Sequence, residues 1–269
     1  MPGGADSIYR ASRRALLDAL EALGHHHTAI VLVGAHAVYL HTGDAKVALA
    51  EFTKDADLAL DPRTLGDDPR IEVAMELAGF SRQGQPGIWT NTEHAQVDLL
   101  VPDNLAGPRG SRSVTLPPHD RLAMRRVRGL EAALVDNSEH ELHAIDSGDA
   151  RTARIRVAGP AALLISKTHK LHERLDTPTR LAPKDAHDIY RLLLATETQP
   201  LAETMRALLT SPIAAGVTSE AIDQLSVLFA NPGSAGARLA GQAEAEIGEP
   251  DTVSVAVSAL VADLLRACE

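Results

Sequence analysis

The hydrophobic pattern of the chain changes once, at Gly159-Pro160, and no other feature limits the fold as strongly. Before this point, short apolar runs typical of buried strands alternate with amphipathic stretches, which is the pattern of α/β proteins. After it, the pattern is helical to the last residue, and Pro160 suits a first helical position. The sequence therefore predicts an α/β (α+β) N-terminal domain over residues 1–158 and an all-helical C-terminal domain over residues 159–269.

The expected elements follow from the period of the apolar residues and from Gly and Pro at their ends. Strands are expected over residues 29–33, 53–60, 88–90, 95–101, 141–145 and 153–157. Helices are expected over residues 7–22, 35–41, 71–78, 160–175, 183–195, 200–210, 218–230, 235–246 and 251–267. The stretch after Pro102 is expected to be looser, and the run His25-His26-His27 is expected in a solvated loop.

Composition excludes several classes of protein. The chain has 269 residues, of which 45% are hydrophobic and 23% charged, as in a globular protein and unlike a disordered one. Aromatic residues make up only 3%, which argues against a base-stacking platform for single-stranded nucleic acid. The single cysteine, Cys268, excludes a disulfide framework and a cysteine-based zinc site. Since the sequence has neither a signal-peptide pattern nor an apolar run near about 18 residues, we expect a cytoplasmic protein with no membrane partner.

Charge is distributed unevenly along the chain. The net charge of −10 counts against binding of nucleic acid over the whole surface. Six arginines nevertheless lie between Arg109 and Arg128, and eight basic residues lie between Arg151 and Lys184. These stretches form either ordinary solvated faces or a local surface for phosphate groups.

Two aspartates in an apolar strand carry the sharpest chemical signal. Asp55 and Asp57 are separated by one residue, so both side chains lie on one face of the strand, about 7 Å apart. Carboxylates at that spacing repel each other unless cations lie between them. Mg²⁺ is the natural cation, because it binds carboxylate and phosphate oxygens together. The alternative explanation is a solvent-exposed strand face that carries two acids.

The neighbouring segments favour a metal site. Residues 31–35 form a strand that enters a helix through the small residues Gly34 and Ala35, and N–H groups at such a helix start can hold a phosphate. Downstream, Asp98 lies in another apolar strand, where an unpaired carboxylate is costly. Together with Asp55 and Asp57, this order of elements can build a two-metal nucleotide site.

The order of motifs resembles the DNA polymerase beta-type nucleotidyltransferase superfamily. Within it, the chain looks most similar to the AbiEii/AbiGii-type nucleotidyltransferases, many of which are toxins of toxin–antitoxin pairs. The resemblance covers about residues 28–195, and its motifs are Gly34-Ala35-His36-Ala37, Thr53-Lys54-Asp55-Ala56-Asp57, Leu163-Leu164-Ile165-Ser166-Lys167 and Pro183-Lys184-Asp185-Ala186-His187-Asp188-Ile189-Tyr190. Ala35 stands where the superfamily usually has Gly or Ser. The resemblance implies a nucleotidyltransferase-like N-terminal domain with a mixed sheet, and a helical domain that contributes Lys and Asp to the nucleotide site.

The resemblance also implies roles for single residues. Asp55, Asp57 and Asp98 would be catalytic metal ligands, and Asp98 would activate or hold the attacking hydroxyl. Lys167 and Asp185 complete the catalytic set, with Lys167 or Lys170 neutralising triphosphate charge. The nucleotide-binding residues would be Gly34, Ala35, Thr53, Lys167, Lys170 and Asp188. An ordinary surface salt-bridge pattern is the alternative for the helix residues.

The implied reaction is Mg²⁺-dependent transfer of a nucleoside monophosphate from a nucleoside triphosphate (NTP) to an acceptor hydroxyl, with two Mg²⁺ ions. The implied acceptor is an RNA (tRNA) 3′ end, with Arg125, Arg126 and Arg128 as RNA-binding residues, and the implied protein partner is a cognate antitoxin. Three alternatives remain: transfer to a small molecule such as an aminoglycoside, transfer to a protein side chain, and a catalytically inactive nucleotide-binding module. The acidic net charge favours a cationic small molecule, whereas the presence of all three aspartates favours an active site.

Overall fold

The computed structural model describes residues 3–43, 47, 53–82, 84–108, 112–175, 177 and 183–269. Its contacts divide the chain into two compact units. The first unit comprises Met1–Ala37, Glu51–Leu130 and Asn137–Ala158, and the second comprises Val38–Ala50, Glu131–Asp136 and Gly159–Glu269. Short segments of the N-terminal part therefore belong to the second unit. The division into independent domains at residue 158 remains a prediction.

The first unit is built on a mixed sheet. Its strands are β1 (Ile30–Val33), β2 (Asp55–Leu60), β3 (Ser81–Arg82), β4 (Ile88–Thr90), β5 (Gln96–Pro102), β6 (Arg125–Val127), β7 (Asn137–His143) and β8 (Thr152–Ala158). They are arranged in the order β3-β4-β5-β2-β1-β8-β7, with β6 paired to β5. The pairs β1–β8, β2–β5 and β5–β6 are parallel, and the other pairs are antiparallel. This arrangement confirms the predicted α/β class with a mixed sheet.

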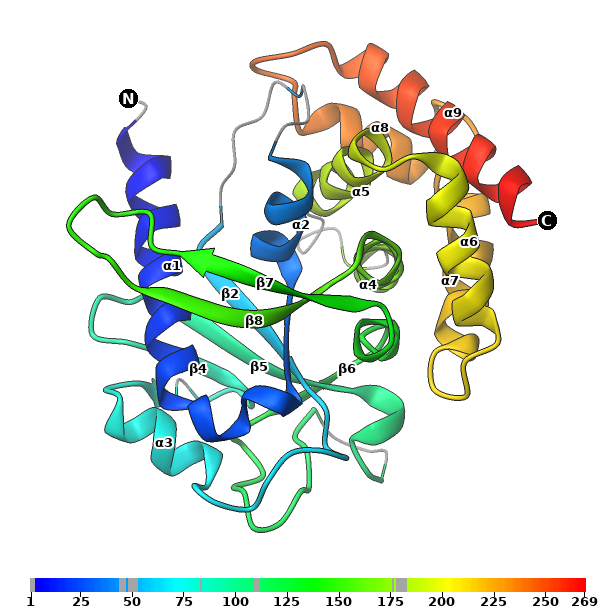
Figure 1. The fold of residues 1–269 in the computed structure, drawn as a ribbon. Coiled ribbons are helices and arrows are strands. Elements are labelled where there is room, and N and C mark those ends of the chain that lie inside the picture. Colours follow the sequence, from blue (N-terminus) through cyan, green and yellow to red (C-terminus); the bar gives the residue numbers. More distant parts are fainter. Residues whose placement is uncertain are drawn as a thin grey trace. The chain divides into compact units, whose positions relative to one another are not determined.

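Helix α1 (Gly3–Ala22) lies across the sheet of the first unit and contacts β2, β5 and β8 (Figure 1). Its buried positions Ser12, Leu16, Ala19 and Leu23, the last just beyond the helix end, recur every three to four residues, which gives the helix one continuous face against the strands. The other helical segments that begin in this unit are the 3₁₀ turn η1 (Gly24–Ala29), α2 (Gly34–Thr42), α3 (Ile71–Leu77) and the 3₁₀ turn η2 (Asp103–Leu105).

The central strands are buried on both faces. All four residues of β1 are buried, and Leu58 of β2 and Leu99 of β5 are fully buried as well. Strands of this kind have near-continuous apolar sequences, because neither face meets water. An acidic side chain in such a strand is therefore unusual and needs a partner.

The second unit is helical. Its elements are the 3₁₀ turn η3 (Glu131–Leu134), α4 (Pro160–Arg174), α5 (Pro183–Ala195), α6 (Thr198–Leu209), α7 (Ala215–Leu228), α8 (Ala235–Gln242) and α9 (Pro250–Cys268). Helix α8 packs on α5 and α9, and α4 packs on α5 and α7 (Figure 1). The six predicted helices are all present, which confirms the predicted all-helical C-terminal part.

Three strands differ from the sequence-based expectation, and one of them is the two-residue strand β3, which was not predicted. Strand β7 begins at Asn137, four residues before the expected start, because its polar residues pair with β8 although most of them face solvent. Polar side chains are normal on a strand that has a neighbour on one side only. Strand β6 lies in the stretch that was expected to be looser, and its sequence Arg125-Arg126-Val127 has no alternating apolar signal.

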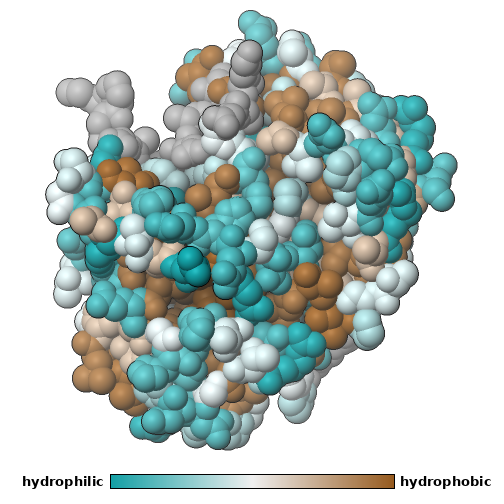
Figure 2. Space-filling model, in the orientation of Figure 1, coloured by the Kyte–Doolittle hydropathy of each residue, from teal (hydrophilic) through white to brown (hydrophobic). Residues whose placement is uncertain are grey.

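Among the helices in the described part of the chain, none has both the length and the apolar character needed to cross a membrane. The face shown in Figure 2 mixes hydrophilic and hydrophobic residues. Individual apolar side chains on a protein surface are ordinary.

Candidate functional site

The pairing register of β2 and β5 brings the three predicted aspartates together. In this parallel pair, Asp57 lies opposite Asp98, and Asp55 lies opposite Gln96. Since opposite residues share a face of the sheet, the three carboxylates point to the same side. Each offers one oxygen, and these oxygens all lie within 4.8 Å of one another. Asp55 and Asp57 are half-buried, and Asp98 is buried.

Burial and neighbouring negative charge together make the ionised form of Asp98 unfavourable. Burial raises the pKa of Asp98 to about 7, and the charge of Asp57 adds to the effect. The guanidinium of Arg125 acts in the opposite direction but does not cancel it. A divalent cation would relieve this repulsion, since oxygen ligands with negative charge are those that Mg²⁺ prefers.

Gly34 adjoins the acidic cluster and is required there. Its φ is +67°, in the region that favours glycine. A Cβ atom at this position would lie 2.0 Å from Oδ2 of Asp57, so no other residue fits without moving that carboxylate. Ala35, the second turn residue, is buried in the first turn of α2. The start of α2, with its unbonded N–H groups, therefore lies beside Asp57.

Thr53 orients one of the acids. Its hydroxyl donates a hydrogen bond to Oδ1 of Asp55 at 2.9 Å, and the residue is only 1% exposed. The predicted nucleotide-binding role of Thr53 remains a prediction. The observed contact gives this side chain a positioning function for the Asp55 carboxylate.

Arg125 is a member of the cluster that sequence reasoning did not place there. Strand β6 pairs with β5 so that Arg125 lies opposite Leu100, two residues after Asp98 and on the same face. The guanidinium donates a hydrogen bond from Nη2 to Oδ2 of Asp98. The sequence offers no signal for this contact, because a three-residue strand has no readable register.

The other arginines predicted to bind RNA have partners within the first unit. Arg126 donates to Asp103 at 3.1 Å and to the backbone carbonyls of residues 106–108. The Arg128 side chain is 43% exposed and lies 3.6 Å from Asp103. RNA binding by Arg125, Arg126 and Arg128 remains a prediction, and Arg128 is the most accessible of the three. Arg109 and Arg180 of the basic stretches lie outside the described residues.

The predicted lysine and aspartates of the second unit form one ion-pair cluster between α4 and α5. Nζ of Lys167 lies 2.5 Å from Asp188 and 3.2 Å from Asp185, and the lysine side chain is 4% exposed. Asp185 also pairs with Lys170 at 3.2 Å and with Arg174 at 2.7 Å. The cluster is buried, so the alternative of an ordinary surface salt-bridge pattern does not describe it. Lys170, with 40% of its side chain exposed, is its accessible cation.

The charges in this second-unit cluster are well compensated. Burial alone would raise the pKa of Asp185, but Lys167, Lys170 and Arg174 outweigh burial and hold that pKa well below its usual range. Asp185 is therefore a permanent anion that orders three cations. Its predicted catalytic role, and the nucleotide-binding roles of Lys167, Lys170 and Asp188, remain predictions.

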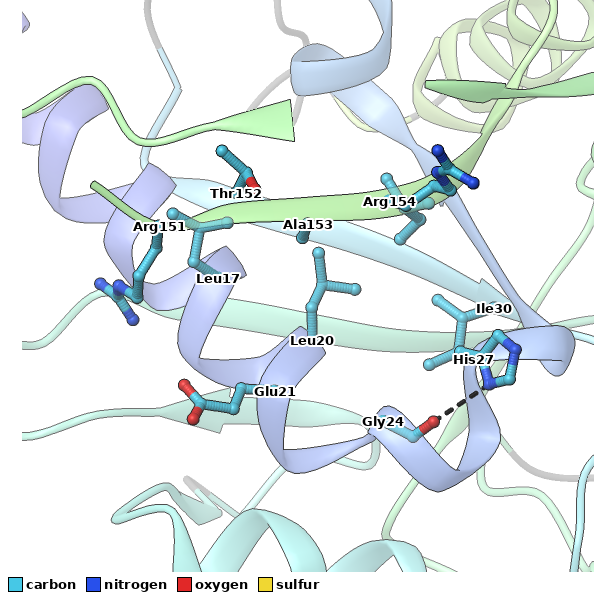
Figure 3. A pocket seen from close by; sticks show the side chains of 11 residues that line it. Leu17, Leu20, Glu21, Gly24, His27, Ile30, Arg151, Thr152, Ala153 and Arg154 are labelled. Atoms are coloured by element: carbon cyan, nitrogen blue, oxygen red, sulfur yellow. Dashed lines mark hydrogen bonds between the residues drawn. The ribbon is translucent and has the colours of Figure 1, made fainter. Parts of the chain in front are cut away.

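A separate cavity of about 430 Å³ lies in the first unit (Figure 3). Its apolar lining comes mainly from Leu17 and Leu20 of α1 and from Ile30, and its polar lining includes Arg151 and Arg154 of the β8 segment. None of the three clustered aspartates lines it. This cavity does not have the chemistry of the acidic cluster.

Comparison with known proteins agrees with the geometry. A sequence model of a nucleotidyltransferase family matches residues 12–210, which is most of the chain and includes Gly34, all three aspartates and the Lys167 cluster. No curated protein matches the chain. No solved structure matches it either. The extent of the family match establishes that this chain belongs to the nucleotidyltransferase family.

Proposed function

We propose that the protein is a Mg²⁺-dependent nucleotidyltransferase of the AbiEii/AbiGii type, which transfers a nucleoside monophosphate from an NTP to an acceptor hydroxyl. The observation that carries the proposal is the convergence of Asp55, Asp57 and Asp98 beside the glycine turn at Gly34. Members of a family with this reaction need a site for metal ions and for a triphosphate. Both requirements fit this corner of the first unit.

The donor set fits Mg²⁺. Asp55 and Asp57 would hold both ions, and Asp98 would hold one of them while it faces the acceptor. The bound ions would neutralise charge on the attacking oxygen and on the leaving pyrophosphate. All three ligands are hard carboxylate oxygens, which are the ligands that Mg²⁺ prefers.

The residues of the chain would act as follows. The N–H groups at the start of α2 would bind phosphate oxygens, which could approach closely because Gly34 has no side chain. The acceptor oxygen attacks the α-phosphorus, and the bond from that phosphorus to the pyrophosphate oxygen breaks. Asp98 would accept the proton of the acceptor hydroxyl as the new bond forms.

We further propose that the helical part of the chain supplies a cation for the triphosphate. Lys170 is a better candidate than Lys167, because Lys167 is enclosed by Asp185 and Asp188 whereas Lys170 is partly exposed. Lys167 then acts as a positioning residue that holds α4 and α5 together.

RNA, and specifically the 3′ end of tRNA, is the proposed acceptor, with an antitoxin protein as the proposed partner in the cytoplasm. The resemblance to AbiEii/AbiGii-type enzymes and the basic stretches support this choice. The net charge of −10 supports a different acceptor, a cationic small molecule such as an aminoglycoside. The two acceptors predict different labelled products.

The test uses each of the four NTPs labelled on the α-phosphate, with Mg²⁺ and either total RNA or an aminoglycoside panel. We expect RNA to retain the α label when Mg²⁺ is present and to remain unlabelled when EDTA is added. A label on the γ-phosphate should not be retained in RNA. Labelling of an aminoglycoside or of a protein would show that this molecule, and not RNA, is the acceptor. NTP binding with no transfer to any acceptor would favour an inactive nucleotide-binding module and contradict the proposed reaction.

A further inference from the structure

Arg125 is held against the acidic cluster by the backbone around it. Strand β6 takes over from β4 along the same edge of β5, and Gly87 lies at the changeover. Gly87 accepts a hydrogen bond from the Leu99 N–H and donates one to the Leu122 carbonyl. A Cβ atom at Gly87 would lie 2.6 Å from the backbone nitrogen of Arg125 and 2.8 Å from its Cγ. The side chain of Arg125 therefore approaches the cluster through space that only a glycine leaves open.

The guanidinium of Arg125 forms an ion pair with one of the clustered carboxylates. It donates to Oδ2 of Asp98, whose side chain is 7% exposed, while 27% of the Arg125 side chain is exposed. Its Nε is buried and has no hydrogen-bond partner among the described residues. Three carboxylates and one guanidinium carry a formal charge of about −2, so the cluster still attracts cations, although less strongly than three carboxylates alone.

We infer that Arg125 is a built-in competitor for the metal: it serves as the counter-ion of Asp98 in the metal-free protein and lowers the affinity of the cluster for divalent cations. This inference rests on the proposed function, because it takes Asp55, Asp57 and Asp98 as metal ligands. A guanidinium that is hydrogen-bonded to a ligand carboxylate repels a divalent cation at that carboxylate. It also withdraws one carboxylate oxygen, so a metal ion has to displace the arginine or bind beside it.

The inference predicts opposite effects on two measurable quantities. Loss of the positive charge at Arg125 should tighten metal binding, because the competitor is gone. The same loss should lower the stability of the metal-free protein, because the repulsion among the three carboxylates is then no longer offset by the Arg125 charge. A merely structural arginine would lower stability but would not tighten metal binding.

The experiment measures Mn²⁺ binding to the full chain, without nucleotide, by electron paramagnetic resonance, and the thermal shift that Mn²⁺ produces. The variants are Arg125→Met, which keeps an apolar stem of similar reach, Arg125→Lys, which keeps the charge, and Asp57→Asn, which removes a ligand. Arg128→Met is the matched control, since it removes one positive charge from the same segment but its partner is Asp103.

The expected result is a Kd for Mn²⁺ at least about tenfold tighter in Arg125→Met than in the wild type, with a larger Mn²⁺-induced rise in Tm. The Kd of Arg125→Lys for Mn²⁺ should lie closer to the wild-type value than that of Arg125→Met. Arg128→Met should change the Kd by less than about threefold. An unchanged or weaker Kd in Arg125→Met, with Mn²⁺ binding that still depends on Asp57, overturns the inference and leaves the proposed function intact. Absence of Asp57-dependent Mn²⁺ binding in both the wild type and Arg125→Met overturns the proposed function and the inference together.

Discussion

Gly34 shows how a single backbone position constrains the proposed site. Its φ of +67° lies in the left-handed region, and a Cβ atom added to it would point at the Asp57 carboxylate. The first property makes any other residue strained, and the second leaves no room for even a methyl group. Sequence reasoning selected this glycine because small residues at a helix start allow phosphate to approach, but it did not reveal the contact with Asp57.

Gly34→Ala should abolish nucleotide transfer and lower the free energy of unfolding by about 1–3 kcal/mol, through backbone strain and displacement of Asp57. Gly79→Ala is the matched control, because Gly79 also has a left-handed φ of +82° but an added Cβ would meet no atom within 4 Å. Gly79→Ala should lower the free energy of unfolding by a comparable amount through backbone strain and should retain nucleotide transfer. Labelled-NTP assays and urea unfolding measure the two effects, and wild-type transfer by Gly34→Ala would contradict the role given to the turn.

Asp98 gives the metal-free protein a pH-dependent stability. Its pKa is raised to about 7 in the folded protein, whereas an aspartate in the unfolded chain titrates near about 3.9. Between these pH values the folded protein holds a proton that the unfolded chain has released. The contribution of Asp98 to the free energy of unfolding should therefore fall as pH rises from about 4 to about 7, by about 3 kcal/mol.

Urea unfolding in EDTA at a series of pH values measures this dependence. Asp98→Asn should remove the fall in the free energy of unfolding that Asp98 contributes in that window, and saturating Mg²⁺ should restore the stability of the wild type at neutral pH. A difference between the wild-type and Asp98→Asn curves that stays constant from about pH 4 to about pH 7 would show that Asp98 does not carry the raised pKa.

At the scale of the elements, periodic apolar patterns were enough to predict most helices and the central strands. The six helices from α4 to α9 were predicted because their apolar residues recur at helical spacing. Strand β6 and the early start of β7 were not predicted, since their sequences carry no apolar alternation. The run at residues 25–27 was expected in a solvated loop, but it lies in the 3₁₀ turn η1, where His26 is buried and hydrogen-bonds through Nε2 to the Pro69 carbonyl. That contact joins segments more than forty residues apart, which local sequence cannot reveal.

The helix pair α4–α5 should depend strongly on one of its lysines and weakly on the other. Lys167→Met removes the buried cation that lies 2.5 Å from Asp188 and one of the three cations that pair with Asp185, so the expected loss of stability is about 3–5 kcal/mol. Lys170→Met removes a partly exposed pair and should cost less than about 1 kcal/mol. If urea unfolding gives equal losses for the two variants, the buried-cluster interpretation is wrong.

At the scale of the whole molecule, the acidic net charge favours a cationic acceptor, whereas the basic stretches favour an acceptor with phosphate groups. RNA would have to bind through local positive charge, and each phosphate that the protein neutralises releases condensed counterions. Arg121 and Arg128 are the arginines of the first basic stretch that this hypothesis tests best, because both are exposed and neither contacts the three clustered aspartates.

The double variant Arg121→Glu with Arg128→Glu should cut RNA labelling several-fold and leave Mn²⁺ binding unchanged. In the wild type, labelling at sub-saturating RNA should fall steeply between about 50 and 200 mM salt. If RNA labelling changes neither with salt nor in the double variant, RNA does not bind through this basic surface. Any transfer to an aminoglycoside should be unchanged in the double variant.

The central claim is that Asp55, Asp57 and Asp98 form the metal centre of a nucleotidyltransferase, and Asp57→Asn tests it most directly. The measurement is the Mg²⁺-dependent rate of α-label transfer by the wild type, by Asp57→Asn and by the control Asp67→Asn, with Tm measured in parallel. Asp67 serves as the control because its side chain is exposed and lies outside the cluster. The account predicts a fall of at least about 100-fold in Asp57→Asn at an unchanged or higher metal-free Tm, and a rate close to the wild type in the control. Wild-type transfer by Asp57→Asn at matched Mg²⁺ would contradict the claim.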